Sequence, residues 1–130
     1  NVNDTHGHFF GDYCLIEIAD ILKKFFNRET DIVARFGGEE FVIISSSDDV
    51  KILRARFEKL RQQIANHSFK YNVKDSIQLT ISIGIAFGNA NYSRQQEDWL
   101  VIADECLYLA KNNGRNQTEI KVLDATKFQP

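Results

Sequence analysis

The sequence predicts an α+β domain in which helices flank a mainly antiparallel central sheet. Three stretches show the three-and-four spacing of apolar residues that is typical of amphipathic helices, and one stretch alternates strictly with period two. Two further apolar runs stand on either side of a glycine pair, which is the pattern of a β-hairpin. Hairpin-linked strands interleaved with helices favour one sheet with helices packed against it.

The first part of the chain is expected to form a helix and then a hairpin. Apolar residues recur at helical spacing over 12–27, so we expect the first helix there. The apolar runs 32–34 and 41–44 flank Gly37-Gly38, and paired glycines accept the positive φ angles of a tight turn. The hairpin tip is therefore expected at these glycines.

The second part is expected to continue this alternation of helices and strands. A second helix is predicted over 48–66, where apolar residues step by three and four. Every odd position over 77–87 is apolar, so this segment is expected to be one long strand with one buried face. A third helix is predicted over 98–113, with Gly114 as its C-terminal stop, followed by a last strand over 118–123.

Composition limits the classes of function. The chain has 130 residues, of which 43% are hydrophobic and 26% charged, as expected for one globular domain. A net charge of -2 argues against a broad nucleic-acid or membrane surface, so any polyanion must be bound by a local group of cations. Cys14 and Cys106 lie far apart without metal-ligand spacing, and we expect both to pack within helices in a reducing compartment. Because the chain begins at Asn1 and not at Met, we interpret it as a piece of a longer protein.

The glycine pair is followed directly by two carboxylates, Glu39 and Glu40. A hairpin tip of this kind leaves the backbone open beside two hard oxygen donors. Mg²⁺ usually takes one or two carboxylates together with substrate phosphates, so the turn could hold such an ion. The alternative is a solvated acidic turn without a ligand.

A polar segment ahead of the first helix holds Asn3, His8 and Asp12, with Asp4 and His6 between them. Asp12 stands where a carboxylate would cap the helix N-terminus, which is its default explanation. An amide and a carboxylate together also match the edge of guanine, Asn3 toward the O6 and N7 acceptors and Asp12 toward the N1 and N2 donors. His8 either braces the loop or contacts a ligand. His6, like His67 later in the chain, is expected at the surface.

Two pairs of charged residues each allow two interpretations. Lys111 and Arg115 lie four apart at the end of the third helix, where they either stabilise the helix dipole or clamp the β and γ phosphates of a nucleotide. Arg28 and Asp31 precede the first hairpin strand. They form either a surface ion pair contributing under about 1 kcal/mol or an anion site, in which the arginine binds phosphate and the carboxylate reads a guanine edge.

Taken together, the chain resembles the GGDEF family of diguanylate cyclases, whose catalytic domain has the nucleotidyl cyclase fold. Four separated segments carry the resemblance in the family's order, and they cover nearly the whole chain. They are Asn3-Asp4-Thr5-His6-Gly7-His8-Phe9-Phe10-Gly11-Asp12, Ala34-Arg35-Phe36-Gly37-Gly38-Glu39-Glu40-Phe41, Leu79-Thr80-Ile81-Ser82-Ile83-Gly84-Ile85-Ala86 and the stretch from Ala103 to Asn116.

The resemblance implies an enzyme that condenses two GTP into cyclic di-GMP, a bacterial second messenger, and releases two pyrophosphates. Two domains would face each other as a homodimer, each holding one GTP. Glu39 would ligate Mg²⁺, or Mn²⁺ in its place, and help to deprotonate the 3′-hydroxyl, with Glu40 supporting it. The other roles implied are guanine recognition by Asn3 and Asp12, a place in the nucleotide pocket for His8, and binding of the terminal phosphates by Lys111 and Arg115.

The resemblance also implies feedback inhibition. Arg28 and Asp31 fall where the family binds cyclic di-GMP as an inhibitor, and an arginine of the second helix would complete that site: Arg54, Arg56 or Arg61. The family's first strand, which carries a metal-binding aspartate, and a phosphate-binding lysine would precede Asn1, so the chain 1–130 is expected to be a GGDEF domain lacking its first strand, with a sensor region upstream.

Two other functions remain open at this point. One is a catalytically inactive GGDEF domain that acts as a receptor for cyclic di-GMP or GTP, and the other is a dimerisation module that uses the second helix. The resemblance implies a cytoplasmic domain with no nucleic-acid partner and no direct membrane contact. It leaves open whether the full-length protein is anchored in the inner membrane.

Overall fold

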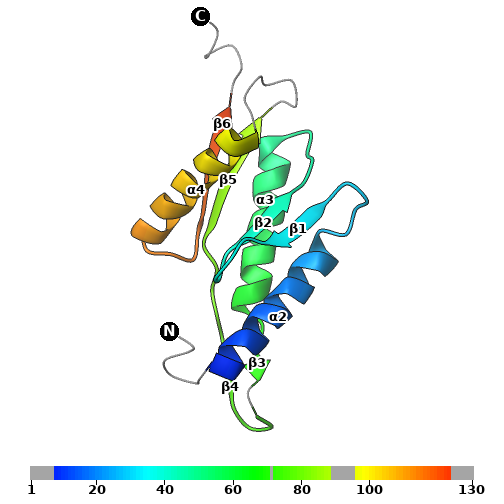
Figure 1. Ribbon diagram of the computed structural model, residues 1–130, viewed down its shortest axis with the longest axis vertical. Coiled ribbons are helices and arrows are strands. Elements are labelled where there is room, and N and C mark those ends of the chain that lie inside the picture. Colours follow the sequence, from blue (N-terminus) through cyan, green and yellow to red (C-terminus); the bar gives the residue numbers. More distant parts are fainter. Residues whose placement is uncertain (1–7, 71, 89–95, 124–130) are drawn as a thin grey trace, which may run out of the picture. The chain divides into compact units, whose positions relative to one another are not determined.

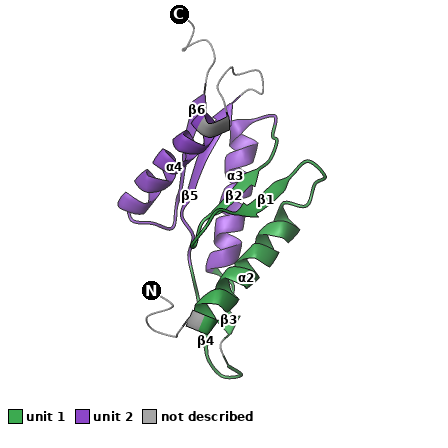
Figure 2. Ribbon diagram, in the orientation of Figure 1, with its two compact units in different colours: residues 1–47, 66–79 green, residues 48–65, 80–130 purple. Residues whose placement is uncertain are grey.

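The computed structural model describes residues 8–70, 72–88 and 96–123. The chain divides into two compact units, which Figure 2 shows in different colours. Unit 1 comprises 1–47 and 66–79, and unit 2 comprises 48–65 and 80–130. Helices alternate with strands along both, so the predicted α+β class is confirmed. Within the described ranges, none of the helices combines the length and hydropathy needed to span a bilayer.

The described residues of unit 1 form one helix and two short antiparallel strand pairs, which can be followed in Figure 1. Its elements are α2 (His8–Phe25), β1 (Ile32–Arg35), β2 (Phe41–Ile44), β3 (Phe69–Lys70) and β4 (Ser76–Ile77). β1 and β2 form the predicted hairpin, with Ile32 opposite Ile44 and Arg35 opposite Phe41. The β3–β4 pair was not predicted from the sequence, because two residues are too few for a recognisable period.

Helix α2 begins four residues earlier than its apolar period predicts. The helix starts at His8, and Asp12 lies one turn inside it. The interpretation of Asp12 as an N-terminal cap is therefore wrong, because a capping residue stands ahead of the first helical turn. The apolar stripe is as expected, with Cys14, Ile18 and Leu22 buried.

The segment after α3 is anchored to α2 within unit 1. His67 Nε2 lies 3.0 Å from Glu17 Oε1, and the His67 ring meets the fully buried Phe69 ring edge-on at 4.7 Å. His67 is thus half-buried and partnered, whereas a surface residue was expected from the sequence.

Unit 2 contains a parallel strand pair joined through a helix. Its elements are α3 (Val50–Ala65), β5 (Ile83–Gly88), α4 (Gln96–Asn112) and β6 (Thr118–Leu123). β5 and β6 run side by side in parallel, and α4 lies along them (Figure 1). A parallel connection needs a long crossover, usually a helix, which α4 provides. Of the strand pairs in the described residues, β5–β6 is parallel, and the two pairs of unit 1 are antiparallel.

The single long strand expected over 77–87 is interrupted. Pairing with β3 ends at Ile77, and pairing with β6 begins at Ile83. The alternation in burial nonetheless continues across 78–81. Period-two patterning reports which face is buried, but a strand also needs a hydrogen-bonding neighbour, which hydropathy does not specify.

Gly84 is the point where α4 meets β5. A Cβ placed on Gly84 would collide with Leu107 N and Ala103 O, and would stand 2.7 Å from Leu107 Cα. The helix backbone therefore packs directly on the strand backbone, which only a residue without a side chain allows. This contact fixes the position of α4 on the β5–β6 pair.

Both cysteines are packing residues, as expected. Cys14 on α2 and Cys106 on α4 are buried and unpaired with each other. Burial raises the pKa of both thiols, and the nearby Glu17 carboxylate adds to the effect on Cys14. A raised pKa keeps a thiol protonated and unreactive, so neither residue suits nucleophilic chemistry.

Candidate functional site

The tip of the β1–β2 hairpin is a backbone turn with two glycines at positive φ. Gly37 has φ 101° and Gly38 has φ 53°. The Phe36 N–H donates to Glu40 O at 2.8 Å, and the Glu40 N–H donates to Gly37 O at 3.0 Å. These angles are readily available to glycine, which explains the glycine pair.

Arg35 braces this turn from the end of β1. Its Nε and Nη2 both donate to the carbonyl of Gly38, at 3.0 and 2.7 Å. A guanidinium suits this contact because its N–H groups form a rigid fork. The tip is thus closed by its own backbone and by a neighbouring side chain.

The two acidic residues of the tip differ in exposure. Glu39 is exposed and Glu40 is half-buried. Among the described residues, no atom beyond the chain neighbours lies within 4 Å of a Cβ placed on Gly37 or Gly38, so the backbone beside the carboxylates is open to a ligand. Carboxylate oxygens are the donors that Mg²⁺ prefers, and the set fits an ion held by one or two carboxylates plus phosphates. In the part of the chain that the structure describes, no group of three or more His, Cys, Asp or Glu residues converges into a complete protein-only metal cage.

The end of α4 in unit 2 presents the two predicted cations. Lys111 stands in the last turn of the helix and is half-buried, whereas Arg115 follows the helix and is exposed. Gly114, with φ 116°, ends the helix as expected, and the Arg115 N–H donates back to Ala110 O at 2.9 Å. Lys111 and Arg115 therefore stand on either side of one helix terminus.

A cluster of polar contacts around the backbone that carries Arg115 was not predicted from the sequence. Arg61 of α3 donates from Nη1 to Asn116 Oδ1 at 2.6 Å, and the Asn116 N–H donates to Ser82 Oγ at 3.2 Å. The Gln117 side chain donates to the carbonyls of Asn113 and Arg115, each at 3.0 Å. The only signal in the sequence is the polar run after Gly114, which does not identify its partners.

Arg28 and Asp31 are brought together in unit 1, and not as a simple surface ion pair. The Asp31 side chain is 0% exposed and the Arg28 side chain is 48% exposed. Asp31 accepts from Ser45 Oγ at 2.7 Å and from the Arg28 backbone N–H at 3.1 Å, and Arg28 Nη2 also donates to Ser45 Oγ and Ser46 O at 2.6 and 2.7 Å.

This network also sets the charge of Asp31. Burial alone would raise the pKa of the carboxyl, but the hydrogen bonds from Ser45 and from Arg28 outweigh it, so the pKa of Asp31 lies below its usual value. The carboxylate is therefore ionised at neutral pH, and it holds the Arg28 guanidinium at the base of the hairpin.

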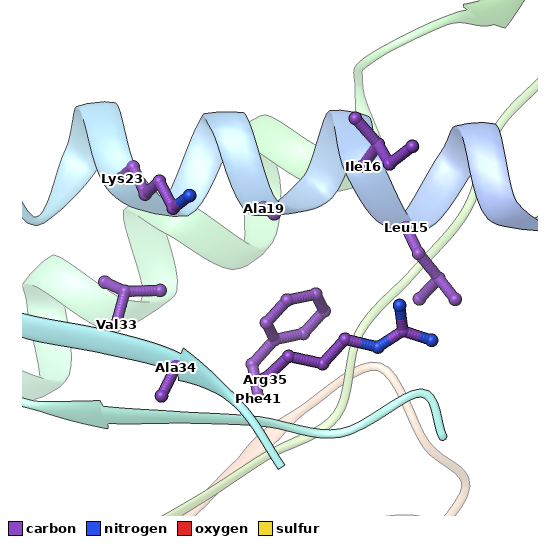
Figure 3. A pocket seen from close by; sticks show the side chains of 8 residues that line it. All are labelled: Leu15, Ile16, Ala19, Lys23, Val33, Ala34, Arg35 and Phe41. Atoms are coloured by element: carbon purple, nitrogen blue, oxygen red, sulfur yellow. The ribbon is translucent and has the colours of Figure 1, made fainter. Parts of the chain in front are cut away.

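A hollow of about 170 Å³ lies between α2 and the hairpin. Figure 3 shows the Phe41 ring and the Arg35 side chain projecting toward α2, with Lys23 at the other end of the hollow. The remaining lining is apolar: Leu15, Ile16, Ala19, Val33 and Ala34. The hollow therefore has mainly apolar walls, with a cation near each end.

Comparison with known proteins decides the family. The family model of the diguanylate cyclase GGDEF domain matches residues 1–117 of the chain. The chain belongs to the GGDEF domain family. This GGDEF domain is 37% identical over 121 residues to diguanylate cyclase A of Treponema denticola, covering 92% of the chain and 32% of that protein. It is 36% identical over 124 residues to diguanylate cyclase DosC of Escherichia coli, covering 92% of the chain and 25% of DosC.

Solved structures agree with this assignment. The active GGEEF domain of a diguanylate cyclase from Vibrio cholerae superposes with a TM-score of 0.79 at 27% identity, over 95% of this chain and 76% of that one. The GGDEF domain of DgcB from Caulobacter crescentus in complex with c-di-GMP gives a TM-score of 0.80 at 25% identity, over 91% of this chain and 68% of that one. The predicted family and fold are thus confirmed. This GGDEF domain spans a third or less of the length of the two relatives named above.

The sequence-predicted site residues of this GGDEF domain are distributed over both units. Glu39 and Glu40 lie at the hairpin tip of unit 1, and Lys111 and Arg115 lie at the end of α4 in unit 2. Asp12 is exposed on α2. Asn3 and the side chain of His8, like His6, lie outside the described residues.

Proposed function

We propose that this GGDEF domain is a diguanylate cyclase that condenses two GTP into cyclic di-GMP and releases two pyrophosphates. The observation that carries the proposal is the hairpin tip, where Glu39 and Glu40 stand beside open backbone at Gly37 and Gly38. Relatives named as diguanylate cyclases align with 92% of the chain, including this tip. A receptor does not require an exposed carboxylate at that place, so the tip favours catalysis.

Glu39 acts on the attacking hydroxyl in this proposal. Its carboxylate accepts the proton of a GTP 3′-hydroxyl as that oxygen bonds to the α-phosphorus of the second GTP. The bond from the α-phosphorus to the bridging oxygen breaks, and pyrophosphate leaves. Reactions of this class depend mainly on in-line positioning and charge neutralisation, which polar side chains at fixed positions provide.

Glu39 would also hold Mg²⁺, or Mn²⁺ in its place, with Glu40 as a supporting carboxylate. When bound, the ion would neutralise phosphate charge and polarise the phosphoryl oxygens. Substrate phosphates and water would complete its coordination, as is usual for Mg²⁺.

The remaining roles concern binding of GTP. Lys111 and Arg115 would hold the terminal phosphates, and the exposed Arg115 guanidinium can do so bidentately. Asp12, with Asn3 and His8 preceding it, would recognise guanine. Each domain would hold one GTP, so catalysis requires a homodimer in which two nucleotides meet. We place this reaction in the cytoplasm, where GTP is available.

Arg28 and Asp31 would form the inhibitory site for cyclic di-GMP. The support is that Asp31 is ionised and holds the half-exposed Arg28 at a fixed place, so the guanidinium is available to a phosphate at little cost in ordering. Arg61 of α3 is engaged by Glu58 and Asn116, so it is not available to an inhibitory site.

The test is turnover by the full-length protein with GTP and Mg²⁺, followed by chromatography of the products. We expect cyclic di-GMP and pyrophosphate from the parent, and a rate at least about 100-fold lower for Glu39→Gln, which removes the charge at constant shape. Glu105→Gln is the matched control, because Glu105 is an exposed carboxylate on α4. An inactive parent that still binds cyclic di-GMP would establish the receptor function instead.

A further inference from the structure

The loop that carries Arg115 has an unusual backbone. Gly114, Arg115 and Asn116 have successive φ angles of 116°, 64° and 48°. A residue with a side chain is disfavoured in the left-handed region, because its Cβ comes close to the backbone. Arg115 and Asn116 both occupy it, so the surrounding structure must hold them there.

Residues distant in sequence supply several of the contacts that hold this backbone. Arg61 donates from Nη1 to Asn116 Oδ1 at 2.6 Å and to Asn116 O at 3.3 Å. Ser82 Oγ accepts from the Asn116 N–H, and the Gln117 amide spans the carbonyls of Asn113 and Arg115. The backbone on each side of Arg115 is therefore fixed.

Glu58 binds the other edge of the Arg61 guanidinium and so fixes the Arg61 side chain. Nε and Nη2 both donate to Glu58 Oε2, at 2.9 and 2.7 Å. The Arg61 side chain is only 17% exposed and that of Glu58 32% exposed. The hydrogen bond from Arg61 is also the main cause that lowers the pKa of Glu58, so this carboxylate stays ionised. A planar fork with donors on two sides can bridge Glu58 and Asn116, whereas a lysine offers a single ammonium.

We propose that Arg61 is a positioning residue: through Asn116 it holds Arg115 in the left-handed conformation from which its exposed guanidinium binds the terminal phosphates of GTP. This inference rests on the proposed function of Arg115. Arg61 does not contact the nucleotide; it acts through the loop. Its role is distinct from that of an inhibitory-site arginine, since both edges of its guanidinium are occupied within unit 2.

The experiment compares binding of GTP and of GMP to the full-length protein by calorimetry in Mg²⁺. GMP lacks the β and γ phosphates, so it reports on the rest of the nucleotide site. We expect Arg61→Gln to weaken the binding of GTP about tenfold, which corresponds to the loss of one charge-assisted contact, and to leave the affinity for GMP unchanged. Lys59→Ala is the matched control, because it removes an exposed cation from the same helix.

Two further variants complete the test. Arg115→Ala should weaken GTP binding in the same selective way. Adding Arg61→Gln to this variant should cause no further loss of affinity, because Arg61 acts through Arg115. If Arg61→Gln does not fold, Asn116→Gly removes the side-chain acceptor of the shorter Arg61 hydrogen bond while it tolerates the positive φ, and the same selective loss is expected.

The outcomes separate this inference from the proposed function. Unchanged GTP affinity in Arg115→Ala would refute the phosphate role on which both depend. A loss in Arg115→Ala without a loss in Arg61→Gln or Asn116→Gly overturns the positioning role alone. An equal loss of GTP and GMP in the Arg61 or Asn116 variants also overturns it, because it shows a general structural effect.

Discussion

The packing of α4 on Gly84 makes a quantitative prediction for Gly84→Ala. The added methyl group would meet the backbone of Ala103 and Leu107, and backbone cannot rotate away as a side chain can. Helix α4 must therefore shift outward from β5. Because Lys111 stands in the last turn of α4 and Arg115 follows the helix directly, their positions shift with it.

The magnitude follows from two opposing terms. Overpacking of a close contact costs about 1–3 kcal/mol, and a backbone contact places this site at the upper end. Replacing glycine by alanine restricts the unfolded chain and returns roughly 0.4–1 kcal/mol. We therefore expect a net loss of about 2 kcal/mol, which corresponds to a decrease in Tm of roughly 6–10 °C for a domain of this size.

The assay is urea and thermal denaturation followed by circular dichroism. Gly88→Ala is the matched control, since its Cβ would approach the end of the Trp99 side chain at 2.9 Å, which can move, and Leu123 Cβ and O at 3.0 and 3.1 Å, which are milder contacts than those at Gly84. We expect Gly84→Ala to lose more stability than Gly88→Ala. A Gly84→Ala variant as stable as the parent would refute the direct backbone packing of α4 on β5.

Four further predictions concern unit 1 and the nucleotide. Gly37→Ala should destabilise the domain more than Gly38→Ala, because φ 101° lies outside the left-handed basin that φ 53° occupies; equal midpoints in urea would contradict this. Asp31 has a lowered pKa, so its contribution to stability is present above the unfolded value near 3.8 and is lost as the pH falls through the folded value. Asp31→Asn should therefore reduce stability at pH 7 and flatten the loss of stability below pH 4, as measured by urea titrations across pH; parallel profiles would exclude this role. Arg28→Ala should relieve inhibition by cyclic di-GMP without lowering the initial rate. An initial rate as low as that of Glu39→Gln would show that Arg28 belongs to the active site. Asp12→Asn should weaken the preference for GTP over ATP in competition binding, since an amide no longer simply accepts from both guanine donors, and unchanged discrimination would count against base recognition.

The sequence predicts the elements whose signals are local. The glycine pair with flanking apolar runs predicted the β1–β2 hairpin, and three-and-four spacing predicted all the helices of the described residues within a few residues of their bounds. The start of α2 at His8 was missed because the glycines and polar residues up to Asp12 were interpreted as a segment ahead of the helix, although the buried Phe10 stands four residues before the buried Cys14.

Features that depend on distant partners could not be predicted in the same way. Arg61 and Asn116 are 55 residues apart, and nothing in either neighbourhood indicates the other. The pairing of β5 with β6 in parallel, and the gap at 78–82, likewise depend on which strands become neighbours. The pair Arg28 and Asp31 was identified from its spacing, but burial of the carboxylate depends on Ser45 across the hairpin.

The closure of the hairpin tip has a consequence for how such domains diverge. Its bonds run between main-chain atoms of Phe36, Gly37 and Glu40 and from the Arg35 guanidinium to Gly38, so the side chain of Glu39 contributes nothing to holding the turn. A substitution at Glu39 would then remove the proposed proton acceptor and metal ligand while the turn keeps its bonds. The proposed activity would thus be lost in descent without loss of the fold.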